Sequence, residues 1–416
     1  MSTETVNIQF IGAEGDGVAR TADGPVYVPF TLPGEDVAIA RVKSESSVMS
    51  WGSTSPDRVA PRCRHFGTEG DGGACGGCSL QHWADLPYQD YKRNLVIDAL
   101  KTRGIETDVA PLVTCSPGER RRVTMTARLT DKGILLGYMQ AGSHHVVNVE
   151  ECPIAHPAIV ARLASVRRLA SALGSGSEPF RITIQVTTSG LDLNFTDLKK
   201  PDAKKRQAAV DLCLKEKGIA RISLASEILV EPMKPMVEFG GVQVVLPPGG
   251  FLQATVGAED AMVEVISAHI GKAKRVADLF AGCGTFSLRL ARKSSVHAVE
   301  FDAPALAALD HAARNSQGLK PVTIERRDLF RRPLQPLDLK YIDAVVFDPP
   351  RAGAEAQSLE LANSRVGRIA AVSCNPVTLA RDLGILIAGG YKLKSVTPID
   401  QFLWSSHVEA VALLER

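Results

Sequence analysis

The sequence predicts an α/β protein whose C-terminal half is built on a doubly wound parallel sheet. Three apolar runs, at 276–279, 345–347 and 369–372, have the length and composition of buried strands. Each is followed at once by residues that suit a ligand site: a glycine-rich loop, an acid before two prolines, and a cysteine before Asn-Pro. From Val244 onward such strands alternate with helical patterns, which implies parallel pairing. Because the carboxyl ends of parallel strands meet at one edge, we expect the site there.

Composition and charge limit the class of protein but leave its partner open. The chain has 416 residues, 45% apolar and 23% charged, which is enough for a large core in two or three domains. A net charge of +2 neither requires nor excludes a nucleic-acid partner. The first residues lack a basic segment followed by an apolar run, and no apolar run approaches the roughly 18 residues of a membrane span. We therefore expect a cytoplasmic protein with no membrane partner, whose eight cysteines are reduced and serve metal binding or catalysis.

Residues 1–58 have the pattern of a small β-barrel. Short alternating runs at 6–10, 26–30 and 37–42 are separated by glycine and proline turns. The run from position 15 to position 35, closed by Ser55-Pro56-Asp57-Arg58, resembles a TRAM domain, an oligonucleotide-fold-like barrel found on RNA-modifying enzymes. The resemblance implies RNA binding. An ordinary small barrel used for protein contacts is the alternative.

Four cysteines in the next region are candidate metal ligands. Cys75 and Cys78 have two glycines between them, Cys63 lies upstream, and Cys152 lies far downstream. Four thiolates suffice for one metal centre, and their spacing does not distinguish zinc from iron–sulfur. Reduced structural thiols are the alternative.

A helix and then a mixed sheet are predicted between the cysteines and the C-terminal half. Apolar residues at helical spacing indicate a helix over 88–104, and a second helical pattern covers 154–173. Three consecutive arginines at 120–122 either grip phosphates or form a solvated strand edge. The strand patterns lie at 123–136, 181–186 and 191–195.

The glycine-rich loop 281–285 suits a nucleoside without phosphates. It lacks both the six-residue dinucleotide fingerprint and the lysine of a P-loop. Glu300 ends the next strand, where an acid accepts hydrogen bonds from ribose hydroxyls, and Asp328 follows a third strand, where an acid accepts from an adenine amino group. S-adenosylmethionine (SAM) has both groups and no phosphate, so this trio favours SAM. A glycine turn beside two surface acids is the alternative.

An ordered set of motifs resembles that of the RNA 5-methyluridine methyltransferases. The motifs are Phe251-Leu252-Gln253, the segment 278–287, Asp348-Pro349-Pro350-Arg351, Ser373-Cys374-Asn375-Pro376 and His407-Val408-Glu409. The Cys-Gly-Gly-Cys-x-x-Gln-His motif and the N-terminal segment extend the resemblance over nearly the whole chain, toward the iron–sulfur 23S rRNA enzymes of this family. Two departures are visible. Eleven residues separate Cys63 from Cys75, more than the family usually places there, and Thr255 stands where the family commonly has Asn.

The resemblance implies a fold and a set of site residues. The fold is a Rossmann-like SAM-dependent methyltransferase domain at 86–117 and 243–416, with an N-terminal oligonucleotide-fold-like TRAM barrel at 1–58. A mixed α+β iron–sulfur and RNA-binding domain at 59–85 and 118–242 lies between them. A 4Fe–4S cluster would be held by Cys63, Cys75, Cys78 and Cys152. The cofactor or target-base pocket would be lined by Gln253, Phe280, Thr285, Glu300, Asp328 and Asp348.

The chemistry of uracil gives two further residues their predicted roles. Carbon 5 of the ring is a poor nucleophile until a thiolate adds to carbon 6, so Cys374 is the predicted nucleophile. A base must afterwards remove the carbon 5 proton, and Glu409 is the predicted base.

The predicted function is SAM-dependent methylation of a uridine in RNA by a monomeric enzyme, and ribosomal RNA is favoured over transfer RNA. An iron–sulfur RNA-binding assembly factor is the alternative from another class, although Cys374 and Glu409 argue against it. A cytosine-5-methyltransferase is disfavoured because those enzymes place their cysteine after a proline, whereas Cys374 follows Ser373.

Overall fold

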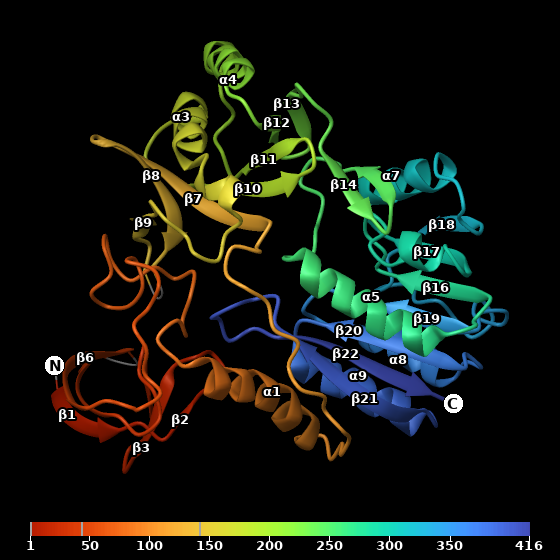
Figure 1. Cartoon of the computed structure of the whole chain (residues 1–416), viewed down its shortest axis with the longest axis horizontal. Helices are drawn as coiled ribbons and strands as arrows, with labels where there is room; N and C mark the ends of the chain where they lie inside the picture. The colour runs from red at the N-terminus through yellow and green to blue at the C-terminus, as the bar shows by residue number, and fades with distance from the viewer. Residues whose placement is uncertain (1, 43–44, 141–142) are drawn as a thin grey trace.

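The computed structural model describes residues 2–42, 45–140 and 143–416, and its N-terminal part holds two three-stranded antiparallel sheets (Figure 1, lower left). One sheet pairs β1 (Ser2–Asn7), β5 (Asp36–Val42) and β6 (Glu45–Ser53) in that order. The other pairs β2 (Phe10–Ile11), β3 (Gly17–Thr21) and β4 (Gly24–Val28). Alternate residues of both sheets, such as Val28 and Val37, share one apolar core, which explains the short alternating runs. No pair of described strands links the two sheets into a closed barrel.

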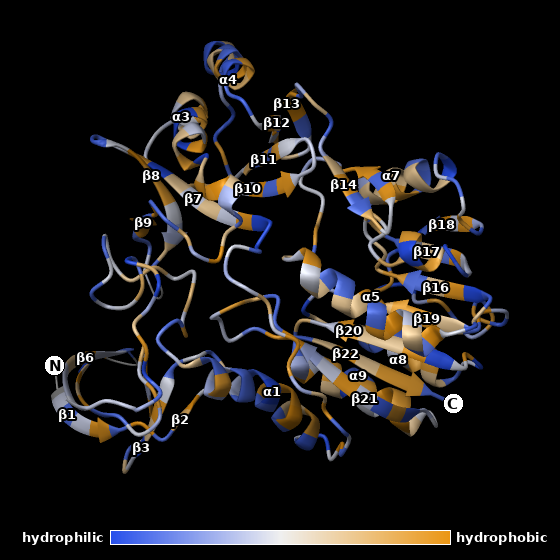
Figure 2. Cartoon of the chain, in the orientation of Figure 1, coloured by the Kyte–Doolittle hydropathy of each residue, from blue (hydrophilic) through white to orange (hydrophobic). Residues whose placement is uncertain are grey.

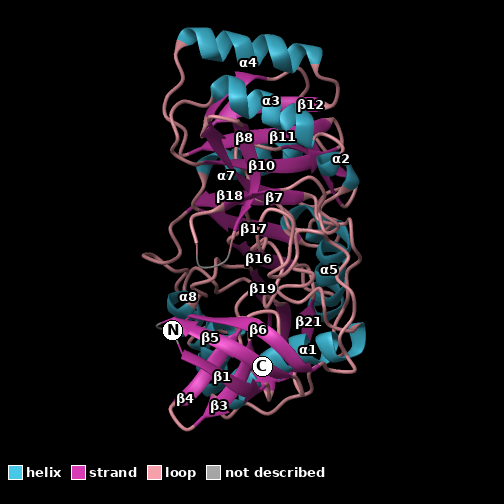
Figure 3. Ribbon diagram, turned by 90° about the vertical axis from the view of Figure 1, so that its left-hand side faces the viewer, coloured by secondary structure: helices cyan, strands magenta, loops and turns pink. Residues whose placement is uncertain are grey.

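The central sheet has seven strands in the order β13-β12-β11-β10-β7-β8-β9, and only the β11–β12 pair is parallel. Helices α3 (Leu163–Leu173) and α4 (Ala203–Lys215) lie on its outer side, above the strands in Figure 3, and bury apolar side chains against it. The short helix α2 (Pro157–Val160) precedes α3. The strands are β7 (Arg122–Thr130), β8 (Gly133–Met139), β9 (Val146–Asn148), β10 (Phe180–Thr187), β11 (Gly190–Thr196), β12 (Ile219–Leu224) and β13 (Glu227–Val230).

The C-terminal sheet also has seven strands, in the order β18-β17-β16-β19-β20-β22-β21. The first five strands are parallel, as predicted, and β22 runs antiparallel to both of its neighbours. The strand order reverses between β16 and β19, which creates the crevice where open α/β sheets bind ligands. The strands are β16 (Arg275–Leu279), β17 (Ser295–Glu300), β18 (Val322–Arg326), β19 (Ala344–Phe347), β20 (Arg368–Ser373), β21 (Lys392–Ile399) and β22 (Glu409–Glu415).

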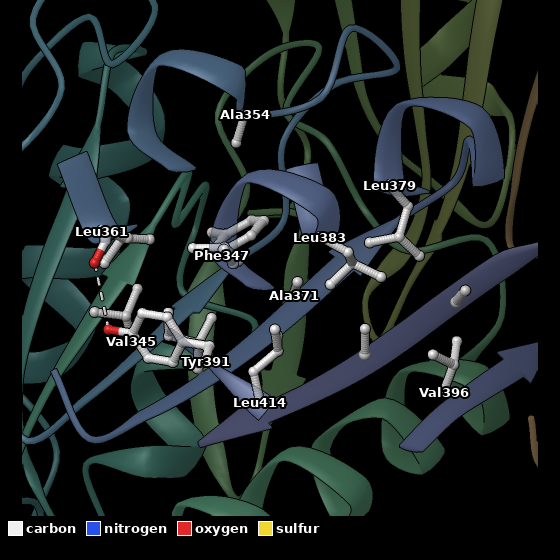
Figure 4. Packing of buried hydrophobic residues seen from close by; sticks show 14 of the residues in the cluster. Val345, Phe347, Ala354, Leu361, Ala371, Leu379, Leu383, Tyr391, Val396 and Leu414 are labelled. Carbon is white, nitrogen blue, oxygen red and sulfur yellow. Dashed lines mark hydrogen bonds between the residues drawn. The ribbon is translucent and has the colours of Figure 1, made fainter. Parts of the chain in front are cut away.

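Both faces of this sheet are buried, and this is why its strands read as continuous apolar runs (Figure 2). Val345 and Phe347 face a core shared with α8 (Glu355–Ala362) and α9 (Pro376–Ala388), part of which Figure 4 shows. Val346 points the other way, toward α5 (Val256–Ile270). The remaining elements are α6 (Ser287–Leu290), α7 (Ala303–Arg314), and the hairpin β14 (Met236–Phe239) and β15 (Val242–Val245).

Helix α1 (Asp85–Lys101) belongs spatially to the C-terminal sheet although it lies far upstream in the sequence. Its residues Val96 and Leu100 are buried in the same core as α9 and β22. The predicted helix over 88–104 is thus confirmed, and Gly104 follows it in the left-handed conformation at φ 66°. Among the described residues, no helix combines the length and the apolar character that crossing a membrane requires.

Candidate active site

A cavity of about 740 Å³ opens at the carboxyl edge of the C-terminal sheet, at the point where the strand order reverses. The ends of β16, β17, β19 and β20 reach it, together with the segment before α5 and the start of β22. The structure brings together in this cavity all eight residues predicted for the cofactor and for catalysis. They are Gln253, Phe280, Thr285, Glu300, Asp328, Asp348, Cys374 and Glu409.

The glycine-rich loop and Glu300 form one rigid wall of the cavity. Glu300 Oε2 accepts from the Gly282 backbone N–H at 3.0 Å, and its Oε1 accepts from the N–H groups of residues 301 and 302. Gly284 has φ 98°, and a Cβ added there would lie 2.5 Å from Leu309 Cδ1. A Cβ added at Gly282 would meet nothing within 4 Å, since this turn of the loop faces open space.

An aromatic pair lies next to this wall, near the second predicted acid. The rings of Phe280 and Phe330 are 5.5 Å apart at 56°, and the Phe330 ring is half exposed. The Phe330 N–H donates to Asp328 Oδ1 at 3.1 Å. An apolar surface of aromatic rings beside a carboxylate suits a flat ring that carries an amino group.

Asp348 and Glu409, two acids of the cavity, are joined through two glutamine side chains. Gln253 Nε2 donates to Asp348 Oδ2 at 2.7 Å. Gln401 Nε2 donates to Gln253 Oε1 at 3.0 Å and to Glu409 Oε2 at 2.6 Å. All four side chains line the cavity, and Glu409 Oε1 has no hydrogen-bond partner among the described residues.

Burial raises the pKa values of Asp348, Glu409 and the Cys374 thiol, so these three groups hold their protons more tightly than usual. It raises the pKa of Asp348, and burial together with the nearby Asp348 raises the pKa of Glu409 well above its ordinary value. Burial also raises the pKa of the Cys374 thiol to about 11, an effect that Glu409 and Asp348 increase and Arg351 opposes. Each group disfavours a negative charge on the others, so proton transfer among them depends on what fills the cavity.

The three consecutive arginines have two different environments, which their sequence did not reveal. Arg120 and Arg122 line the cavity, with their guanidinium groups over the exposed faces of Phe402 at 5.6 Å and Phe251 at 5.1 Å. Arg121 is turned inward, where it donates to the backbone carbonyl oxygen of Gln253 and pairs with the buried Glu259.

Gln401 and Phe402 are among the cavity residues that the sequence did not predict, as are Phe301 and Phe330. Gln401 and Phe402 lie between β21 and β22, in a stretch that has no periodic pattern and precedes the motif His407-Val408-Glu409. The only available signal was their position shortly before Glu409.

The four predicted metal ligands line a second, smaller pocket between the segment 63–81, Tyr138 of β8 and the segment 149–154. Cys63, Cys75, Cys78 and Cys152 all contribute to it. Within the described ranges, no group of three or more His, Cys, Asp or Glu side chains is placed to hold a single metal ion. The predicted 4Fe–4S site at these four cysteines is therefore not supported by the arrangement of the described side chains.

The long segment between Cys63 and Cys75 folds back on itself and is held by hydrogen bonds of His65. His65 Nδ1 lies 2.8 Å from the Asp71 carbonyl oxygen, and His65 Nε2 accepts from the Glu150 N–H at 3.1 Å. The Cys75 N–H donates to the His65 carbonyl oxygen at 3.0 Å. Because of this folding, the additional residues do not displace Cys63 from the pocket.

Comparison with known proteins gives first the class and then the family. The fold is that of a Rossmann-type methyltransferase. It matches the solved tRNA (uracil-54, C5)-methyltransferase of Pyrococcus abyssi in complex with S-adenosyl-L-homocysteine with a TM-score of 0.75 over 99% of each chain, at 23% identity. A family model described as tRNA (Uracil-5-)-methyltransferase matches residues 221–416.

Sequence relatives extend over the full chain. An uncharacterized RNA methyltransferase of Agrobacterium fabrum is 59% identical over 100% of both chains. The 23S rRNA (uracil(1939)-C(5))-methyltransferase RlmD of Halomonas elongata is 32% identical over 98% of this chain and 89% of its own. The chain belongs to the family of RNA (uracil-5-)-methyltransferases and is an RNA-methylating enzyme, which confirms the family recognised from the motifs.

Proposed function

We propose that the protein methylates carbon 5 of one uridine in 23S rRNA, with SAM as methyl donor, through a covalent bond between Cys374 and carbon 6. The observation that supports this most directly is the shared cavity. One thiol, one buried carboxyl group with an unpaired oxygen, and a nucleoside-type glycine loop meet there.

The cavity residues fit SAM. Glu300 would accept from the ribose hydroxyls and Asp328 from the adenine amino group, and the adenine would pack against the aromatic pair Phe280 and Phe330. The turn at Gly282 leaves space for a ligand beside the main chain, as a nucleoside requires. Bound there, SAM would supply an electrophilic methyl group to the neighbouring base.

The residues of the chain would perform the other steps. The Cys374 thiolate adds to carbon 6, and the electron pair of the carbon 5–carbon 6 bond moves toward oxygen 4, which makes carbon 5 nucleophilic. After carbon 5 has been methylated, Glu409 Oε1 takes its proton. The carbon 5–hydrogen electron pair restores the ring double bond as the carbon 6–sulfur bond breaks. Arg351, at the mouth of the site, favours the thiolate form of Cys374.

The N-terminal sheets are proposed as a TRAM-like, oligonucleotide-fold-like barrel that binds RNA. The Arg58 guanidinium lies 4.4 Å from the partly exposed Trp51 ring, and the Arg20 guanidinium lies 5.5 Å from Phe10. Exposed aromatic rings beside arginines are a typical platform for unstacked bases. The proposed domains are 1–58, then 59–85 with 118–242, and a catalytic domain of 86–117 with 243–416.

A 4Fe–4S cluster is proposed for the cysteine pocket. Four thiols line a single pocket, and each thiolate of such a cluster binds a different iron, so they need not converge on one point as for a single ion. Held by Cys63, Cys75, Cys78 and Cys152, the cluster would link the segment 63–78 covalently to the segment that follows β9.

Ribosomal RNA is favoured as substrate because the 23S rRNA enzyme is 32% identical to this chain, whereas the tRNA enzyme is 23% identical. The test is to map 5-methyluridine in ribosomal and transfer RNA from cells without the gene. Loss of one 23S site, restored by the wild-type gene but not by Cys374→Ala, is expected. Unchanged 5-methyluridine in both RNAs would contradict the function, and a lost tRNA site would change the substrate.

A further inference from the structure

Gln401 occupies the middle of the hydrogen-bond chain that joins the two acids of the site. Its side chain is 2% exposed, and both of its polar atoms are paired. Gln401 Oε1 accepts from the Ala254 backbone N–H at 2.9 Å, while its Nε2 donates to Gln253 and to Glu409.

The Ala254 N–H fixes the direction of the whole chain. A backbone N–H only donates, so the atom of Gln401 that faces it must be the carbonyl oxygen. The amide nitrogen of Gln401 then faces Gln253, and the side-chain oxygen Oε1 of Gln253 accepts a hydrogen bond from it. Gln253 is left with its two N–H groups, one directed at Asp348 and the other available to the cavity that it lines.

We propose that Gln401 is a positioning residue with two effects on the reaction. It holds Glu409 through Oε2 so that Oε1, which has no partner among the described residues, is directed to the proton on carbon 5. It also makes Gln253 a donor only, so the pocket accepts a base edge with a carbonyl oxygen, as in uracil, and opposes the amino group of cytosine.

This inference rests on the proposed function, and it separates proton removal from the formation of the adduct. Cys374 adds to carbon 6 without help from Glu409, whereas breaking the carbon 6–sulfur bond requires Glu409 to take the proton. An enzyme with a misdirected Glu409 therefore stops after methyl transfer, with the methylated RNA still bound to Cys374.

Gln401→Met tests the inference, with Gln357→Met as the matched control. Gln357 is also a buried glutamine with both polar atoms paired, but its partners are the N–H and carbonyl oxygen of Leu334, away from the cavity. The reaction is a single turnover with SAM and RNA of natural bases. The readout is the fraction of RNA that remains covalently bound to the protein on a denaturing gel.

We expect Gln401→Met to accumulate at least about ten times more adduct than wild type, and Gln357→Met to resemble wild type. The preference for uridine over cytidine at the target position should be about tenfold smaller in Gln401→Met than in wild type. In that variant Gln253 is free to turn its side-chain oxygen Oε1 toward the base. Gln401→Glu, which keeps the oxygen facing Ala254 but lacks the two N–H donors, should accumulate adduct even if the Met variant fails to fold.

The inference would be overturned if folded Gln401 variants had the adduct levels and the base preference of wild type. It would also be overturned if the variants slowed adduct formation, methyl transfer and RNA release equally, so that no adduct accumulated. Failure of the proposed function looks different. In that case wild-type enzyme would not be trapped on RNA containing 5-fluorouridine, whose fluorine cannot be removed as a proton.

Discussion

At the scale of single residues, the surroundings of Cys374 determine how its reactivity depends on pH. Burial raises the pKa of this thiol to about 11, Glu409 and Asp348 add to the effect, and Arg351 opposes it. The thiolate is therefore a minor form at neutral pH. Below the pKa its population increases about tenfold for each pH unit.

We predict that the single-turnover rate of adduct formation on 5-fluorouridine RNA rises continuously between pH 6 and pH 9. Arg351→Gln should lower this rate about tenfold at a given pH, because it removes the positive charge that favours the thiolate. Arg314→Gln on α7 is the control, because within the described part of the chain Arg314 pairs with Asp310 and lies outside the cavity. A rate independent of pH and equal in all three proteins would contradict the prediction.

At the scale of elements, α1 and the segment before β22 are joined by a buried ion pair. Lys92 Nζ lies 2.9 Å from Asp400 Oδ1, both side chains are almost wholly inaccessible, and Tyr88 donates to Asp400 Oδ2 at 2.6 Å. Burial lowers the pKa of Lys92, and Asp400 opposes this change. The pair fixes the segment that presents Gln401 and Phe402 to the cavity.

A double-mutant cycle should reveal this coupling. Lys92→Met and Asp400→Asn each remove one partner of the pair, and we expect the free energy of unfolding to fall by about 3–5 kcal/mol in each case. The double variant should be destabilised by clearly less than the sum, because no unpaired charge then remains buried. Urea unfolding measures all four proteins, and strictly additive effects would show that the two side chains are not coupled.

The elements that could be predicted from sequence are those with a local signal. The strands ending at Asp348 and Cys374 combine an apolar run with a motif directly after it, so both the strand and the site at its end could be recognised. Gln401 has no such signal, because its partner Gln253 lies 148 residues away. The same reason explains why the inward direction of Arg121 was not foreseen, since its partner Glu259 is 138 residues distant.

At the scale of the whole molecule, the cysteine pocket is physically connected to the active site. The N–H groups of Ser79 and Leu80, directly after Cys78, donate to the Trp404 carbonyl oxygen at 2.9 and 3.0 Å. The Trp404 side chain packs in an apolar cluster that also contacts Cys78 and Cys152. Trp404 lies in the same segment as Gln401, so order in the cysteine region supports order in the cavity.

We predict that Cys78→Ser yields protein without iron or inorganic sulfide and lowers the single-turnover methylation rate at least about tenfold. SAM affinity should stay within about twofold of wild type, because the glycine loop contacts none of these residues. Cys213→Ser, at a buried thiol of α4, is the control. Full activity of an iron-free Cys78→Ser protein would refute the connection.

The position of β22 has a consequence for the timing of synthesis. This last strand, which begins at Glu409, inserts between β20 and β21 and so flanks the strand that ends before Cys374. A nascent chain in which residues up to Cys374 have left the ribosome, but β22 has not, carries the thiol without Glu409 and without the strand that pairs with β20. Such a chain cannot turn over RNA until β22 has emerged and has paired with β20 and β21.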